Sequence, residues 1–206
     1  MRQKYLPYEL SLDTLPTQFH HIPKLPKQLW CLGEAPSPAH KYVTFVGSRK
    51  ASEYALQVVE QIIRDMAGFP VVIVSGLAYG IDAAAHRAAL AHGLSTIAFP
   101  GSGLDRKVLY PHGHHQLAAD ILLNDGCLIS EFKLAQPALP WTFPVRNRLM
   151  AGIADIVVIV EAREKSGSLI TAREALDYGR HVMIVPGQIY NEGCRGSNRQ
   201  IGRAHV

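Results

Sequence analysis

The chain has 206 residues and a formal net charge of +4, with 48% hydrophobic and 18% charged residues. This length suits one substantial α/β domain with a short appendage, and the composition excludes a globally disordered chain. No apolar run approaches the roughly 18 residues that span a bilayer, and the first ten residues lack the pattern of a secretory signal. We therefore expect a soluble, cytoplasmic protein with no membrane partner.

The three cysteines, Cys31, Cys127 and Cys194, are widely spaced and form no CxxC motif. Scattered cysteines in an odd number are typical of reduced thiols in a cytosol. The sequence thus gives no sign of a disulfide framework.

The two ends of the chain differ in texture from the middle. Residues 1–40 are rich in proline and show no sustained hydrophobic period, so we predict an irregular or short-helical lead-in. Residues 200–206 read QIGRAHV, which resembles the translation of a sequencing-library adapter. We expect this segment to be a non-native tail, which leaves residues 41–199 as the main domain.

Within this domain, short apolar runs alternate with helical patterns. The runs lie at residues 42–46, 71–75, 95–99, 127–130, 155–160 and 181–185. The helical patterns cover residues 55–66, 82–92, 113–124, 146–153 and 171–179. Strands that are apolar throughout are typical of a parallel sheet with both faces covered. The alternation predicts an α/β fold with a doubly wound, mainly parallel sheet in three α/β/α layers.

Several polar residues have a structural interpretation in this scheme. Asp82 is expected to cap the helix that follows it, and Thr171 with Glu174 has the spacing of a capping box. Glu161, at the end of an apolar run, is expected to pair with Arg146 or Arg148 and orient it.

The loops that follow the predicted strands are rich in glycine and polar residues. In an open parallel sheet, ligands bind outside the carboxyl ends of the strands, where these loops emerge. Glycines let backbone N–H groups approach an anion closely, and the start of the next helix adds partial positive charge. Basic side chains also outnumber acidic ones in these loops. Together the loops predict a groove that binds phosphates.

Four motifs occur in order along the chain: GSRKAS at 47–52, SGLAYGIDAAAH at 75–86, FPVRNR at 143–148 and SGSLITA at 166–172. This combination is highly specific and resembles the DNA-processing protein A family, also called DprA or Smf. The resemblance runs from about residue 20 to Arg199. One departure is His114, because the family often has asparagine at that position of its YPxxN motif.

The resemblance implies an extended Rossmann-like domain that binds single-stranded DNA. It also implies a role in natural transformation, in which the protein protects incoming single-stranded DNA and loads the RecA recombinase onto it, and it implies a homodimer. It implies no enzymatic activity, no catalytic residue, no cofactor and no metal.

The residues expected to bind DNA are carried over from the matching motifs. Arg49 would contact a phosphate, and Asn147 would bond a base edge or a sugar. Phe143 would stack on a base, although an aromatic residue before Pro144 could instead pack under its loop. The full predicted set is Gly47, Ser48, Arg49, Lys50, Gly76, Leu77, Ala78, Gly80, Lys133, Phe143, Arg146, Asn147, Arg148, Lys165, Ser166, Gly167 and Ser168.

Other functions fit the sequence less well. A dinucleotide-dependent oxidoreductase needs GxGxxG after the first strand and an acid after the second, and the chain has GSRKAS and Ser75 instead. The remaining alternative is a nucleotide-processing hydrolase of the LOG or lysine-decarboxylase-like group, for which Glu174 could be the acid. A metal site at the HGHH run of 112–115 is disfavoured, because no cysteine or carboxylate stands at ligand spacing.

Overall fold

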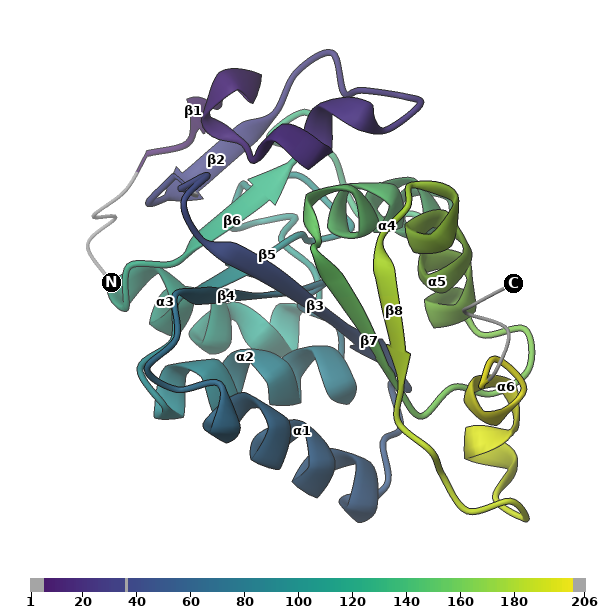
Figure 1. Ribbon diagram of the computed structural model, residues 1–206. Coiled ribbons are helices and arrows are strands. Elements are labelled where there is room, and N and C mark those ends of the chain that lie inside the picture. The colour runs from purple at the N-terminus through teal and green to yellow at the C-terminus, as the bar shows by residue number, and fades with distance from the viewer. Residues whose placement is uncertain (1–5, 36, 202–206) are drawn as a thin grey trace.

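The computed structural model describes residues 6–35 and 37–201, which form one eight-stranded sheet with helices on both faces (Figure 1). The strands follow the order β1-β2-β6-β5-β4-β3-β7-β8. Their bounds are β1 Tyr8–Glu9, β2 Trp30–Gly33, β3 Lys41–Gly47, β4 Val71–Ser75, β5 Thr96–Ala98, β6 Cys127–Ser130, β7 Ile156–Val160 and β8 His181–Ile184. The order of the strands reverses around β3, which lies between β4 and β7.

The six predicted apolar runs are the six parallel strands, β3 to β8. Side chains of a strand alternate between the two faces of the sheet. In β3, Val43 and Phe45 therefore face one apolar cluster, while Tyr42 and Val46 face another. Both faces of β3 to β7 are buried, which explains why these strands are apolar throughout.

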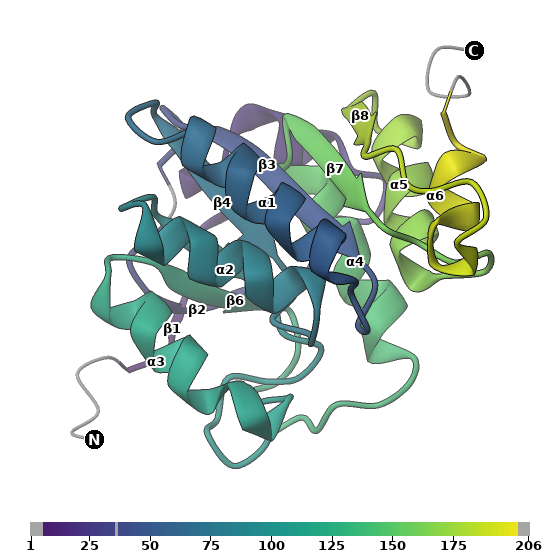
Figure 2. The same cartoon turned by 90° about the horizontal axis from the view of Figure 1, so that it is seen from below.

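Helices cover the two faces in separate layers (Figures 1 and 2). On one face lie α1 (Glu53–Asp65), α2 (Ile81–Ala91) and α3 (His115–Leu123). On the other lie α4 (Thr142–Ile153) and α5 (Gly167–Asp177). The predicted doubly wound, three-layer α/β/α fold is therefore confirmed.

The lead-in contains two strands that the sequence pattern did not indicate. β1 and β2 extend the sheet in antiparallel pairing, β1 against β2 and β2 against β6. Two short 3₁₀ helices, η1 (Leu12–Thr14) and η2 (Thr17–His21), lie between these strands. The buried side chains of Leu10, Phe19 and Ile22 join the same apolar cluster as residues of α4 and α5.

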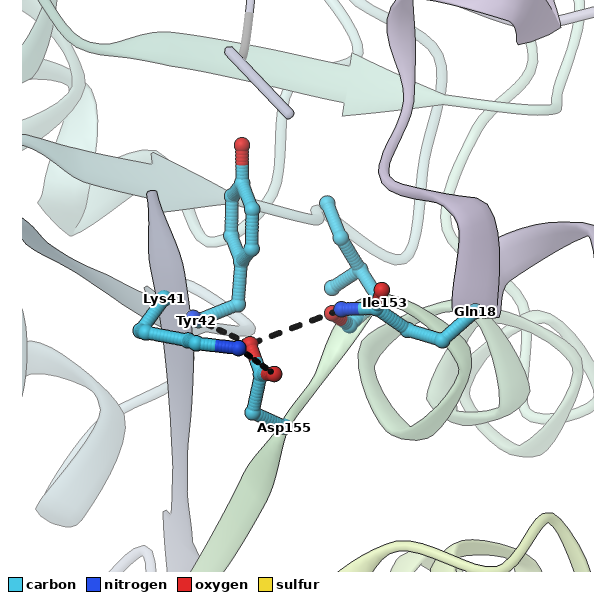
Figure 3. A network of polar contacts seen from close by, with 5 residues as sticks. All are labelled: Gln18, Lys41, Tyr42, Ile153 and Asp155. Atoms are coloured by element: carbon cyan, nitrogen blue, oxygen red, sulfur yellow. Dashed lines mark hydrogen bonds and ion pairs between the residues drawn. The ribbon is translucent and has the colours of Figure 1, made fainter. Parts of the chain in front are cut away.

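A polar network holds the lead-in at the edge of the sheet where β3 and β7 begin (Figure 3). The Asp155 carboxylate accepts hydrogen bonds from the Tyr42 backbone N–H at 2.9 Å and from the Gln18 amide at 3.4 Å. It also pairs with the Lys41 ammonium at 3.1 Å. The Gln18 amide donates a further bond to the Ile153 carbonyl at 3.1 Å. This network therefore lies at the opposite edge of the sheet from the loops that follow the strands.

After β8, the chain forms the short 3₁₀ helix η4 (Glu192–Cys194) and the short helix α6 (Arg195–Asn198). Most of the expected non-native tail, residues 202–206, lies outside the described residues, so that expectation stays a prediction. Among the helices of residues 6–35 and 37–201, none has the length and apolar character needed to cross a membrane.

Candidate functional site

A cleft of about 390 Å³ opens at the carboxyl ends of the central strands. Its walls are the end of β3, the loop after β4, the first two turns of α4 and the start of α5. The lining residues are Val46, Gly47, Arg49, Ala78, Asp82, Pro140, Phe143, Pro144, Arg146, Asn147, Met150, Ser166, Gly167, Ser168 and Thr171. The cleft thus combines polar groups, one helix start and an apolar wall.

At the mouth of the cleft, the Arg49 guanidinium lies over the Phe143 ring, 4.9 Å from its centroid. Arg49 is exposed and Phe143 is half-buried. Across the part of the chain that the structure describes, no hydrogen bond or ion pair occupies the Arg49 guanidinium. Its N–H groups are therefore available to an anion entering the cleft.

The loop of Arg49 is held against the loop that follows β4. The Ile81 backbone N–H donates a hydrogen bond to the Ser48 carbonyl at 3.1 Å. Gly80 adopts φ +73°, and a Cβ at this position would lie 2.1 Å from the Ser48 carbonyl oxygen. Only glycine fits there, since both the left-handed backbone and the close approach exclude a side chain.

Arg146 lies on the floor of the cleft, with only 4% of its surface exposed. Its guanidinium donates hydrogen bonds to the carbonyls of Gly76, at 2.6 Å, and of Phe99, and to the Asn147 side chain at 3.1 Å. Burial lowers the pKa of Arg146 to about 10, although the neighbouring Asp82 opposes this shift. Arg146 thus ties together the loops that follow β4 and β5.

Asp82 is a buried carboxyl group in the same cleft. Its side chain accepts a hydrogen bond from the Ala78 backbone N–H at 3.2 Å. Burial raises the pKa of this carboxyl, while Arg146 and the hydrogen bond from Ala78 work against the shift. Its geometry suits a residue that shapes the loop after β4.

The start of α5 forms the third wall. Ser166 caps the helix, and its hydroxyl accepts a bond from the Ser168 backbone N–H at 3.4 Å. The Asn147 amide donates to the Gly167 carbonyl at 3.3 Å, which joins α4 to α5. The buried Thr171 hydroxyl, one turn further along, has no hydrogen-bond partner among the described residues. The first turn of α5 therefore offers donors to a ligand in the cleft.

The structure brings together in this cleft about half of the residues predicted to bind DNA. They are Gly47, Arg49, Ala78, Phe143, Arg146, Asn147, Ser166, Gly167 and Ser168. The other members of the set do not line the cleft, namely Ser48, Lys50, Gly76, Leu77, Gly80, Lys133, Arg148 and Lys165.

Some of these other residues have clear local roles. The Leu77 side chain is fully buried, and a Cβ on Gly76 would lie 2.2 Å from the Arg146 guanidinium. Arg148 points away from the cleft, where it pairs with Glu131 and donates to the Lys24 carbonyl. Arg148, one of the residues predicted to bind DNA, therefore does not share the cleft of Arg146, because its charge is used to join α4 to the lead-in and to the end of β6.

Two capping predictions are also wrong. The residue that caps α2 is Gly80, so Asp82 lies inside the first turn and faces the cleft. Helix α5 begins at Gly167 and is capped by Ser166, so Thr171 and Glu174 are not a capping box. Both helices begin earlier than the sequence pattern indicates, α2 at Ile81 and α5 at Gly167.

The expected pairing of Glu161 with an arginine of α4 is absent from the ion pairs of the described residues. The Glu161 carboxylate instead accepts hydrogen bonds from the Ser52 backbone N–H, at 3.1 Å, and from the Ser52 hydroxyl. Glu161 thus fixes the start of α1 to the end of β7.

Sequence reasoning did not propose several lining residues, among them Pro140, Met150 and Thr171. Met150 could have been found, because it follows Phe143 and Arg146 at helical spacing on one face of α4. Thr171 is different, because its spacing to Glu174 is typical of a capping box and not of a ligand-binding residue.

His114, at the position where the resembled family often has asparagine, is buried. Its Nδ1 donates to the Leu77 carbonyl at 2.7 Å, and its ring lies 4.6 Å from the Tyr79 ring. The histidine therefore holds the loop after β4 in place. The HGHH run at 112–115 forms a 3₁₀ turn, η3 (His112–His114), followed by α3, which begins at His115. In the described ranges, no group of three potential ligands could hold a metal.

The sequence was also compared with known proteins. The family model of DNA recombination-mediator protein A matches residues 10–205. The chain is 39% identical to the DNA processing protein DprA of Streptococcus pneumoniae, over 93% of this chain and 68% of that protein. It is 41% identical to the protein Smf of Escherichia coli, over 88% of this chain and 48% of that protein. The chain thus spans about half the length of this second relative.

Two solved structures of such proteins share the fold. DNA processing protein A from Streptococcus pneumoniae superposes with a TM-score of 0.87 at 36% identity, over 98% of this chain and 70% of that chain. DNA processing protein A from Helicobacter pylori, for which a single-stranded DNA binding mode is described, superposes with a TM-score of 0.84 at 28% identity, over 98% of this chain and 90% of that chain. From the family match and these likenesses together, the chain belongs to the DNA recombination-mediator protein A family.

Proposed function

We propose that this chain binds single-stranded DNA in the cleft at the carboxyl ends of β3, β4 and β7, as part of DNA processing. The observation that carries the proposal is the Arg49 guanidinium, which has no hydrogen-bond or ion-pair partner among the described residues and lies over the Phe143 ring in the cleft that the start of α5 also lines. The three features of the cleft complement the parts of a nucleotide. The cation attracts the phosphate charge, the aromatic ring offers a surface on which a base can stack, and the helix start offers N–H donors to the phosphate oxygens.

Phosphate oxygens would bind between Arg49 and the first turn of α5. A helix start carries partial positive charge and unpaired N–H groups, which stabilise an anion. The Ser168 and Thr171 hydroxyl groups lie in the same wall and add donors. Buried Arg146 contributes positive potential from below, while its own N–H groups remain bonded to protein carbonyls.

A base would stack at the mouth of the cleft, on the pair formed by Arg49 and Phe143. Base–aromatic stacking is worth about 1–3 kcal/mol per base and tolerates any sequence, because every base has a π-face. An unpaired base can present this face, whereas a base within a duplex is already stacked on its neighbours. The relative from Helicobacter pylori, with its described single-stranded DNA binding mode, supports the same preference.

The test is a binding measurement with one labelled oligonucleotide as a single strand and as a duplex. We expect tighter binding of the single strand, little dependence on its sequence, and weaker binding by a folded Phe143→Ala variant. Phe69→Ala is the matched control, because Phe69 is an exposed aromatic residue beside the start of β4, at the opposite edge of the sheet. Equal affinity for the two forms of DNA would contradict the proposal.

The finer roles rest on family membership. We propose that the bound strand is protected from nucleases and presented to the RecA recombinase during natural transformation, by a homodimer of this chain. Nuclease digestion of the strand with and without the protein tests protection. The rate of RecA assembly on the pre-bound strand tests loading, and light scattering during gel filtration measures the mass in solution.

The hydrolase alternative finds less support in the site. Glu174, its candidate acid, does not line the cleft. We propose that the cleft binds without catalysis. Release of free base from nucleoside monophosphates during incubation with the chain would contradict this.

A further inference from the structure

Phe143, which lines the cleft, is the first of three aromatic rings that contact one another in succession. The Tyr110 ring lies 5.8 Å from the Phe143 ring, and the His112 ring lies 6.4 Å from the Tyr110 ring, centroid to centroid. The rings of each pair meet at steep angles, 67° and 74°, so they are not stacked face to face on one another. We call Phe143, Tyr110 and His112 the aromatic track.

The two outer rings of the track are exposed, although they stand on a fixed base. Tyr110 and His112 are exposed to solvent, whereas the flanking Leu109 and Pro111 are buried. The Tyr110 backbone N–H donates to the Ser102 hydroxyl at 3.2 Å, and the His115 ring donates to the Leu109 carbonyl at 3.0 Å. The backbone that carries the two rings is therefore held in place, while both side chains stay exposed to solvent.

The charge beside the track is positive. Arg106 and Lys107 precede Tyr110 on the same loop, and both are exposed. Only one acid, Asp105, belongs to this exposed stretch of the loop. Exposed aromatic rings with neighbouring cations are the combination by which proteins bind several nucleotides of a single strand.

We propose that the aromatic track is an additional binding site for the bases of a single strand, beyond the nucleotide held in the cleft. This inference rests on the proposed function and extends it, because it assigns the path of the strand. Successive bases stack on Tyr110 and His112, and Arg106 with Lys107 lie near the backbone between them. The track begins at Phe143, which belongs to both sites, so one strand occupies the cleft and the track without a break.

The test compares a short oligothymidylate of about 4 nucleotides with one of about 12, within the range of known single-strand sites. The unsubstituted chain, called the parent below, binds the longer strand more tightly than the shorter one. The double variant Tyr110→Ala with His112→Ala binds the short strand as the parent does, but loses on the order of tenfold in affinity for the longer strand. Tyr110→Phe, which keeps the ring, retains the parent's affinity for both strands.

Three controls separate the possible failures. Phe69→Ala changes an exposed ring at the opposite edge and leaves both affinities unchanged. Arg49→Ala lowers the affinity for both strands. If neither the parent nor any variant binds either strand, the proposed function itself is contradicted. If the double variant binds the longer strand as tightly as the parent does, while Arg49→Ala binds neither strand, the proposed binding in the cleft is supported and the proposed binding on the aromatic track is contradicted.

A second measurement does not depend on substitution. Halogenated uracil at successive positions of the longer strand forms photo-crosslinks with aromatic residues that it contacts. We expect crosslinks to Tyr110 or His112 from positions next to the nucleotide in the cleft. Crosslinks confined to Phe143 would overturn the track. A double variant whose mass in solution differs from the parent's would also overturn it, because such a change assigns the two rings to a contact between copies of the chain.

Discussion

Arg146 shows how one residue type can serve two purposes in a binding site. A cation in a loop-rich, basic region suggests a phosphate ligand. The Arg146 guanidinium instead donates hydrogen bonds to the carbonyls of Gly76 and Phe99. Arg146→Ala leaves these buried acceptors unpaired and Asp82 without its neighbouring charge. We expect a loss of about 2–4 kcal/mol in the free energy of unfolding, measured by urea denaturation. A fold as stable as the parent's would contradict this assignment.

Glu174 gives the chain a measurable response to pH. Burial raises the pKa of its carboxyl to about 7, with Arg148 opposing and Asp177 reinforcing the shift. One of its oxygens is buried without a partner among the described residues. Because the folded state favours the protonated form, its contribution to stability is complete below the unfolded pKa and is lost as the pH rises through about 7.

Glu174→Gln should remove this dependence. Between about pH 5 and pH 8, the parent should lose more free energy of unfolding than the variant. The exposed Glu192, changed to glutamine in the same way, serves as the control and should follow the parent. Identical pH profiles for the parent and Glu174→Gln would refute the assignment.

At the scale of elements, the Asp155 network explains how the lead-in is fixed to the sheet (Figure 3). Asp155→Ala removes the acceptor of the Tyr42 N–H and the partner of Gln18 and Lys41. We expect it to lower the free energy of unfolding by about 1–3 kcal/mol without changing DNA affinity, because the network lies at the opposite edge from the cleft. The exposed Asp65, changed to alanine, should stay within about 0.5 kcal/mol of the parent. A loss of DNA affinity in folded Asp155→Ala would contradict the separation of the two edges.

The elements also show what the sequence could reveal. The strands β3 to β7 were predictable because each is buried on both faces and therefore apolar throughout, and the edge strand β8 was predictable from its apolar run alone. The pattern could not reveal β1 and β2, since two short edge strands in a proline-rich segment carry no period of their own. The starts of α4 and α5 were misplaced by four residues, because Thr142 and Gly167 begin helices without an apolar stripe.

For the candidate site, the motifs predicted the residues that line the cleft better than their roles. Arg49 and the Ser166–Ser168 segment lie where the resemblance places them, at the end of a strand and the start of a helix. The hydrogen bonds and ion pairs of Arg146 and Arg148 are made with groups from distant segments of the chain, such as the Phe99 carbonyl and the Glu131 carboxylate. Such partners meet only in the folded chain, so single-sequence reasoning could not separate a free cation from a buried one.

Over the whole molecule, the net charge of +4 is modest, so binding depends on where cations remain free. One such cation, Arg49, lies at the mouth of the cleft, where the positive potentials of the α5 start and of buried Arg146 add to its own. Binding should therefore be salt-sensitive, because each phosphate contact releases counterions from the strand.

The most direct test measures the affinity of the parent and of Arg49→Ala for a labelled single strand across a salt series. For the parent, the logarithm of the affinity should fall linearly with the logarithm of the salt concentration, by about 0.7 per phosphate contacted. Arg49→Ala should bind more weakly at every salt concentration, with a slope smaller by about 0.7, as expected for one lost phosphate contact. A correctly folded Arg49→Ala protein with the parent's affinity and the parent's slope would contradict the account.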